Sequence, residues 1–333
     1  MIFEEGENLV QEPKGLIHAL LLDGNGGASK LRWRDVCRWD AGQECLWLHF
    51  DYTEPESRQW VQKHSGLNEV AVDSLLCDES RPNVFRSGDD LLIVLRGVNL
   101  NPGSNPEDMV SLRVWTDGKR VVSTRMRNLL STGDLLASLN DNSGPNNAAS
   151  LLIEWIDRIV RRMSDTVDNF EDELLAIEDK LFASEPKDMR NLLLQLRKQS
   201  IGIRRYLAPQ REALNRLIGE PLSWLNELSR LRLRGIADRQ IRHIEDIDEV
   251  RERAAMVQEE LSNSISEQMN RKAYVLTIVA AIFLPLGFFT GLMGINVGGM
   301  PGVESADAFW IVVAMCVGLT GVLGGLFYWK KWF

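Results

Sequence analysis

The residues best suited to chemistry in this sequence lie in the glycine-rich segment 291–302, near the C-terminal end. One asparagine, Asn296, follows Gly294 and Ile295 there, just after a long apolar run. A ring of asparagines would offer neutral amide oxygens to the water shell of a hydrated divalent cation, binding it weakly enough for release. The alternative is a glycine C-cap followed by a turn. The residues alone favour neither interpretation.

Two apolar runs flank this segment, and each is long enough to cross a membrane. Segments 274–293 and 309–329 contain no charged residue, and each spans roughly 30 Å as a helix. Basic residues precede the first run and follow the second: Arg271 and Lys272 before residue 274, and Lys330 and Lys331 after residue 329. Because positive flanks stay in the cytoplasm, both chain ends are predicted to face it. Buried helices of a soluble core are the alternative.

The first apolar run carries a stripe of mostly small residues along one helix face. Its members recur at alternating spacings of four and three: Ala273, Thr277, Ala280, Leu284, Gly287 and Gly291. Such a stripe suits either close helix packing or the wall of a narrow pore. Two helices cannot enclose a pore, so transport would require an oligomer with this stripe turned to the common axis.

The same face becomes acidic before the membrane segment. At an average spacing of about 3.5 residues, the stripe continues inward through Asn270, Ser266, Asn263, Glu259 and Glu252. An acidic vestibule would attract cations, whereas most charged helix faces are simply solvated. Glu252 and Glu259 are therefore candidates for an acidic pore face.

Charge and motifs exclude several classes of function. The chain has 333 residues, with 38 Lys+Arg against 47 Asp+Glu, and only Glu304, Asp307, Lys330 and Lys331 are charged after residue 272. An acidic body does not suit a nucleic-acid partner, which needs clustered Lys and Arg. The glycines before Lys30 do not complete a phosphate-binding loop, and the four histidines are scattered. We predict neither an enzyme nor a resident cofactor, and no cleaved secretory signal.

The elements that must position these residues are an α/β domain and long helices. Apolar stretches predict strands at 16–22, 45–50, 91–98, 110–116 and 120–124. Helical patterns cover 54–64 and 67–77, and Asp117-Gly118 is typical of a short hairpin turn. After the polar loop 140–147 apolar residues recur at helical spacing. Between Pro221 and Pro285 there is no proline, which predicts a helix that continues through the first apolar run, about 90–100 Å in all.

These patterns predict an α+β membrane protein with an N-terminal α/β cytoplasmic domain, a long helical stalk and two C-terminal transmembrane helices. The cytoplasmic part comprises an α/β domain at 1–147 and a helical stalk domain at 148–272. The membrane part comprises a first span at 273–293, an outer loop at 294–308, a second span at 309–329 and a cytoplasmic tail at 330–333.

The C-terminal end resembles the CorA family of divalent-cation transporters, in which Gly-Met-Asn closes the first of two transmembrane helices. Here the motif reads Gly294-Ile295-Asn296, which is similar to the Gly-x-Asn pattern of the zinc-transporting ZntB branch. Further segments resemble that branch: 283–285, 290–292 and 298–302 at the membrane, and 21–24, 197–199 and 204–211 in the body. The resemblance therefore covers nearly the whole chain.

This resemblance implies a homopentameric funnel in the bacterial inner membrane, with both termini in the cytoplasm. It implies an ion-selectivity motif at Gly294, Ile295 and Asn296. The implied pore-lining residues coincide with the stripe: Ala273, Thr277, Ala280, Leu284 and Gly287. The implied function is uptake of Zn²⁺, with Cd²⁺, Ni²⁺ and Co²⁺ as further candidate ions. The ZntB branch is associated with zinc import that is coupled to proton movement. The partners would be the cation, the lipid bilayer and further copies of the chain.

Two alternatives remain open. The first keeps the fold and changes the ion, giving a CorA-type Mg²⁺/Co²⁺ channel; Ile295 in place of Met disfavours it. The second is a membrane-anchored sensor or scaffold without transport. It predicts no ion flux and tolerance of bulky residues at Ala280 and Gly287.

Overall fold

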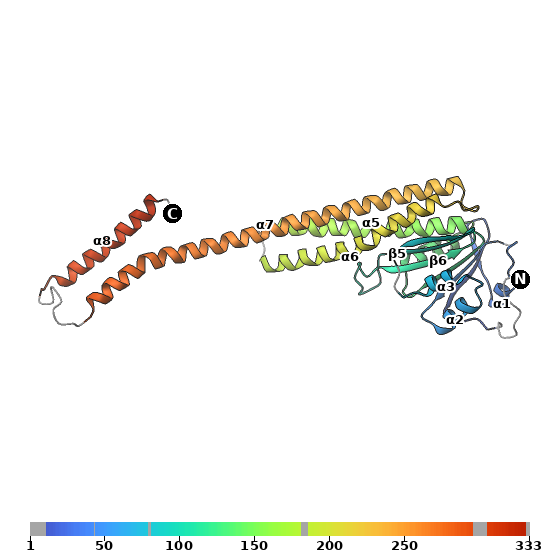
Figure 1. The fold of residues 1–333 in the computed structure, drawn as a ribbon, viewed down its shortest axis with the longest axis horizontal. Coiled ribbons are helices and arrows are strands. Elements are labelled where there is room, and N and C mark those ends of the chain that lie inside the picture. Colours follow the sequence, from blue (N-terminus) through green and yellow to red (C-terminus); the bar gives the residue numbers. More distant parts are fainter. Residues whose placement is uncertain (1–10, 43, 79–80, 181–185, 296–304, 331–333) are drawn as a thin grey trace. The chain divides into compact units, whose positions relative to one another are not determined.

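A computed structural model of the chain describes residues 11–42, 44–78, 81–180, 186–295 and 305–330 (Figure 1). Its contacts divide the chain into two compact units, Met1–Gln258 and Glu259–Phe333. The first unit contains a sheet with helices on both faces. The second contains the most apolar helical segments. The finer domain boundaries expected from the sequence stay predictions.

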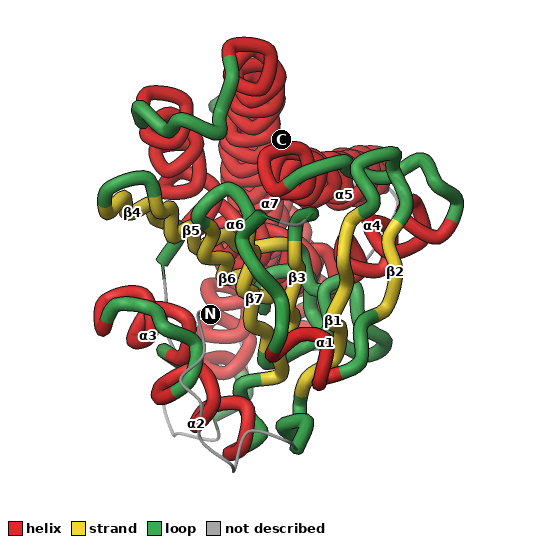
Figure 2. The backbone as a smooth tube through the Cα atoms, turned by 90° about the vertical axis from the view of Figure 1, so that its right-hand side faces the viewer, coloured by secondary structure: helices red, strands yellow, loops and turns green. Residues whose placement is uncertain are grey.

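Seven strands form one sheet in the first unit, in the order β2-β1-β3-β7-β6-β5-β4 (Figure 2). The strands are β1 (Leu16–Leu22), β2 (Ala28–Lys30), β3 (Leu46–Asp51), β4 (Asn83–Ser87), β5 (Asp90–Gly97), β6 (Val110–Thr116) and β7 (Arg120–Arg125). Only the β3–β7 pair is parallel among these neighbours. All five predicted strands are confirmed. The two edge strands β2 and β4 are additions, since short polar strands give no alternating pattern.

The predicted hairpin turn joins β6 to β7. Gly118 has a φ of +88°, which a residue with a Cβ rarely adopts. The carboxylate of Asp117 accepts hydrogen bonds from the backbone N–H groups of Lys119 (2.9 Å) and Arg120 (2.6 Å). Local chemistry therefore sets the register of this strand pair.

One face of the sheet, which we call the α3 face, is covered by short helices: α1 (Trp33–Cys37), α2 (Pro55–Lys63) and α3 (Glu69–Leu76). Leu48, Leu92 and Trp115 point to this side and belong to its core. The side chain of Asn68 caps α3 by accepting from the N–H of Ala71 at 2.8 Å. The two predicted helices in this region, α2 and α3, are thereby confirmed.

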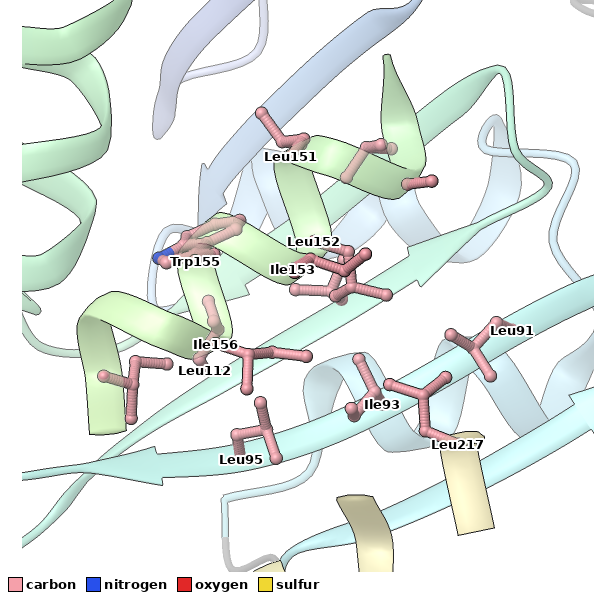
Figure 3. Close-up of a cluster of buried hydrophobic side chains, with 14 of the residues drawn as sticks. Leu91, Ile93, Leu95, Leu112, Leu151, Leu152, Ile153, Trp155, Ile156 and Leu217 are labelled. Carbon is pink, nitrogen blue, oxygen red and sulfur yellow. The ribbon is translucent and has the colours of Figure 1, made fainter. Parts of the chain in front are cut away.

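The opposite face, which we call the α5 face, is covered by longer helices: α4 (Leu130–Asn140), α5 (Ala148–Lys180) and α6 (Pro186–Gly219). Figure 3 shows Leu152 and Ile156 of α5 beside Ile93 and Leu95 of β5. Trp155 is fully buried, and its indole N–H donates to Thr132 at 3.2 Å. Burying such a side chain contributes roughly 1.5–3 kcal/mol, so this face supplies much of the unit's stability.

Helix α7 (Glu227–Met293) begins six residues after the predicted proline boundary at Pro221. The loop before it is tied to the β4–β5 turn, because Asp89 accepts from the N–H of Ser223 at 2.8 Å and from the indole of Trp224 through its carbonyl at 2.9 Å. Within the first unit, ion pairs join α7 to α5: Arg239–Asp157 and Arg253–Glu178, both 2.7 Å.

The second unit contains the end of α7 and helix α8 (Ala308–Trp329). Both helices include segments long and apolar enough to cross a membrane. Helix α7 ends at Met293 and α8 ends at Trp329, as the apolar runs predict. Pro285 lies inside α7 and removes one backbone donor there, leaving the carbonyl of Ala281 without its helical partner.

Candidate functional site

The predicted ion motif begins where α7 ends. The N–H of Gly294 donates to the carbonyls of Thr290 (3.0 Å) and Gly291 (3.1 Å), which closes the last turn. Ile295 follows and is exposed. Asn296, the residue expected to meet the ion, lies outside the described residues. Its role therefore stays a prediction.

The predicted pore-lining stripe is exposed along its whole length within this chain. Ala273, Thr277, Ala280, Leu284 and Gly287 are all exposed, Leu284 by 72%. The hydroxyl of Thr277 donates to the carbonyl of Ala273 at 2.9 Å, so its oxygen lone pairs stay available on the helix surface. The stripe is thus an exposed face of small groups with one hydroxyl, interrupted by the large side chain of Leu284.

The glycines of this stripe are not required by any neighbour in the part of the chain that the structure describes. A Cβ added at Gly287 or Gly291 would meet nothing within 4 Å. The same holds at Gly318 and Gly321 of α8. Small residues at these positions leave room for something outside the single chain, either a packed helix or an open path.

The predicted acidic residues Glu252 and Glu259 are exposed, each within its own unit. Two aspartates nearby on α7 are less accessible, whereas Glu245 and Glu249 are exposed like Glu252. Asp248 is paired with Arg204 of α6 at 2.5 Å and also with Arg251. Burial together with nearby carboxylates raises the pKa of Asp246.

The basic segment 204–211, which is part of α6, attaches this helix to its neighbours. Arg204 reaches α7 through Asp248, and Gln210 accepts from the backbone N–H of Arg96 at the end of β5 (2.7 Å). The guanidinium groups of Arg96 and Arg205 each lie 4.9 Å from the ring centre of Tyr206. The sequence indicated this segment only through resemblance. The contacts show a structural role, joining α6 to the sheet and to α7.

Two of the four scattered histidines have buried structural surroundings. His49 is buried, and its Nδ1 lies 2.8 Å from the hydroxyl of Ser123. His243 is nearly buried, with its Nε2 3.0 Å from the hydroxyl of Ser164. Across the described ranges, His, Cys, Asp and Glu side chains form no group of three arranged to hold a metal ion.

Comparisons with known proteins agree with this geometry. The family profile described as CorA-like Mg²⁺ transporter protein matches residues 42–331. The divalent cation transporter CmaX of Pseudomonas aeruginosa is 38% identical over 96% of this chain and 98% of its own length. The zinc transport protein ZntB of Yersinia enterocolitica is 37% identical, covering 95% of this chain and 94% of its own.

Solved structures confirm the fold. The full-length CmaX structure covers 97% of this chain and all of its own, with a TM-score of 0.84 and 37% identity. The CorA magnesium transporter of Methanocaldococcus jannaschii gives a TM-score of 0.81 at 20% identity, covering 95% of this chain and 99% of its own. The α/β domain, long helix and two C-terminal apolar helices are thus the fold expected from the sequence. The chain belongs to the CorA family and is a divalent-cation transporter.

Proposed function

We propose that this chain is a zinc transporter that takes up Zn²⁺ across the bacterial inner membrane as a homo-oligomer, a pentamer by resemblance to the family. The observation that carries the proposal is the similarity, over nearly the full length, to proteins named zinc transport protein ZntB. Ile295 supports it, because this residue departs from the Gly-Met-Asn of the magnesium branch. Both termini would lie in the cytoplasm, where the basic flanks belong.

The proposed path uses the exposed stripe of α7. Asn296 would meet the hydrated ion through its amide oxygen, and the small residues from Gly287 to Ala273 would form the conduit. Support comes from Gly287 and Gly291, at which a Cβ would have open space in the chain itself. On the cytoplasmic side, Glu252 and Glu259 would draw the cation onward.

Proton coupling, if the transporter uses it, must operate without a titratable relay in the spans. Segments 274–293 and 309–329 contain no Asp, Glu, His, Lys or Arg. A coupling proton would therefore travel through water or through groups outside the bilayer. Such a mechanism predicts that a pH gradient changes the rate of Zn²⁺ influx.

A Mg²⁺/Co²⁺ channel is the second candidate, favoured by the name of the matching family profile. The two functions differ in what competes with Zn²⁺. For a zinc transporter, an excess of Mg²⁺ leaves Zn²⁺ influx nearly unchanged. For a magnesium channel, Mg²⁺ enters by itself and displaces Zn²⁺.

The test is uptake by the purified chain in liposomes that contain a Zn²⁺-sensitive dye and a pH dye. The proposal predicts Zn²⁺ influx that excess Mg²⁺ does not abolish. Influx that grows with an inward proton gradient would establish coupling, and influx indifferent to pH would establish a passive channel. Mg²⁺ influx without a Zn²⁺ signal would overturn the zinc assignment. Influx of neither ion would support a sensor or scaffold.

A further inference from the structure

Basic side chains lie at the same end of both apolar segments. Arg271 and Lys272 come directly before the first segment in α7, and Lys330 comes directly after α8. A hairpin of two spans returns the chain to the side of the membrane that it left, so these three residues belong to one membrane surface. The sequence adds Lys331 next to Lys330. We call Arg271, Lys272 and Lys330 the basic collar.

The chain itself leaves the collar charges uncompensated. All three side chains are exposed. Among the residues that the structure describes, none of the three takes part in an ion pair. The nearest carboxylate in the sequence before Arg271 is Glu267, which is exposed as well, and no acid occurs between residues 272 and 304. The collar charges are therefore available to an anionic partner.

Exposed aromatic side chains adjoin the collar and indicate where this partner lies. Tyr328 and Trp329 end α8 and are 79% and 82% exposed, and Tyr274 follows the collar residues of α7 closely. Tyr and Trp have an apolar body and a polar tip, so they sit where the hydrocarbon of a membrane meets its headgroups. Bases beside such rings lie at the depth of the lipid phosphates, which favours a lipid headgroup over a soluble partner.

The position of Arg271 on α7 favours contact with lipid rather than with the transported cation. At 100° per residue, Arg271 lies about 160° around the helix from Ala273, which begins the small-residue stripe. It shares its side of the helix with Val275 and Ile278, which are large and apolar. With the stripe turned to the common axis, this side faces outward. This step rests on the proposed function, which puts several copies around one axis with the stripe inward.

We propose that the basic collar binds the headgroups of anionic phospholipids, and that these lipids stabilise the assembled oligomer. Clusters of Lys and Arg next to a membrane span attract anionic headgroups. The guanidinium of Arg271 can donate two parallel hydrogen bonds to one phosphate. Several copies around one axis bring their collars together, and anionic headgroups offset the repulsion between these like charges. Lipids without net charge do not provide this compensation.

Lipid titration of the full-length oligomer in neutral detergent tests the proposal. Phosphatidylglycerol is compared with phosphatidylcholine of the same acyl chains and with inorganic phosphate. Bound lipids are counted by native mass spectrometry, and the temperature at which the oligomer dissociates is measured. Phosphatidylglycerol is expected to stay bound and to raise this temperature. Equal retention of phosphatidylcholine would overturn the proposal, since acyl chains alone would explain it. Equal stabilisation by inorganic phosphate would also overturn it, in favour of a site for a free anion.

A matched pair of variants locates the site. Arg271→Gln with Lys330→Gln removes two collar charges and is expected to weaken phosphatidylglycerol binding roughly fivefold per charge. Arg34→Gln with Lys63→Gln removes two exposed charges from the first unit and is expected to bind like the unaltered chain. Arg271→Lys keeps the charge and should retain most of the binding. Equal binding by the two double variants would show that the collar is not the site.

Two further measurements keep the test decisive. If the collar variant does not assemble, retention of phosphatidylglycerol by the unaltered chain is measured at rising salt, where attraction between exposed charges falls. Retention that salt leaves unchanged would refute the collar. Lipid retention needs no ion flux, so Zn²⁺ influx into liposomes separates the two claims. Influx without selective retention refutes only the lipid site, and selective retention without influx refutes only the zinc function.

Discussion

Some glycines of the two units differ in what surrounds them. In the first unit, a Cβ at Gly97 would lie 2.6 Å from the side chain of Leu129, and one at Gly202 would lie 2.8 Å from that of Glu107. In the second unit, a Cβ at Gly287 or Gly318 would meet no atom of the described chain within 4 Å. The first kind of glycine is explained by its own chain, and the second is not.

Large apolar side chains show the same contrast. Trp47 and Trp155 of the first unit are completely buried, whereas Phe288 and Trp310 of the second unit are exposed. The first unit therefore satisfies its hydrophobic groups by folding. The second unit leaves such groups exposed in the single chain, as helices that face lipid or other helices do. The exposed apolar surfaces of the second unit are therefore the ones available for membrane contact and assembly.

The largest expected effect comes from filling the stripe. We expect Gly287→Leu to abolish Zn²⁺ influx in liposomes, because a side chain would project into the proposed conduit. Thermal unfolding of the first unit, followed by tryptophan fluorescence, should be unchanged. Ile278→Leu, nine residues away and therefore on the opposite side of the same helix, is the matched control and should leave influx intact. Normal influx in the Gly287 variant would mean that this stripe is a packing face.

The reciprocal test lies in the first unit. Gly118→Ala is expected to destabilise the protein by about 3 kcal/mol, because it combines a positive φ with a clash against Trp224. Gly88→Ala shares the positive φ but has open space, so about 1 kcal/mol is expected. Chemical denaturation of both variants measures the difference. Equal losses would show that the contact with Trp224 contributes nothing.

An acid-induced loss of stability should also belong to the first unit. Burial, with Arg239 and Arg242 nearby, lowers the pKa of His243 to about 4 from its ordinary 6.5. The unfolded chain then binds a proton that the folded chain does not, so stability falls as the pH drops from 6.5 towards 4, by up to about 3 kcal/mol. His243→Gln should reduce this pH dependence in unfolding experiments. His49 and His18, whose pKa values burial also lowers, would sustain the remainder.

The smallest effect is expected at the ion pair between α6 and α7. Arg204 and Asp248 are partly exposed, so Arg204→Gln should cost less than about 1 kcal/mol in chemical denaturation. A loss several times larger would mean that segment 204–211 controls the position of α7 far more strongly than its surface contacts indicate.

Much of this fold is readable from the sequence, for physical reasons that differ between elements. The chargeless runs ending at Met293 and Trp329 predict their helices because membrane spans need continuous apolar length. Asp117-Gly118 predicts its hairpin through turn chemistry. Strands β2 and β4 are missed because edge strands are short and polar. Helix α4 is missed because its sequence, with Gly133 and several hydroxyls, has weak helix propensity and is held by packing.

The candidate site is less readable, because the role proposed for it requires several copies of the chain. A stripe such as Thr277 to Gly287 has the same appearance in sequence whether it packs or conducts. The stripe is exposed in the single chain, but so are both apolar segments as a whole, so exposure does not distinguish the two roles. Asn296 is proposed on motif alone.

Zn²⁺ influx into liposomes, with the unaltered chain and Asn296→Ala compared side by side, tests the central claim most directly. We predict rapid dye response with the unaltered chain and a loss of influx in the variant, while both proteins remain oligomeric. Equal influx in the two proteins would contradict the proposed role of Asn296 in meeting the hydrated ion. No influx from correctly assembled, unaltered protein would contradict zinc transport itself.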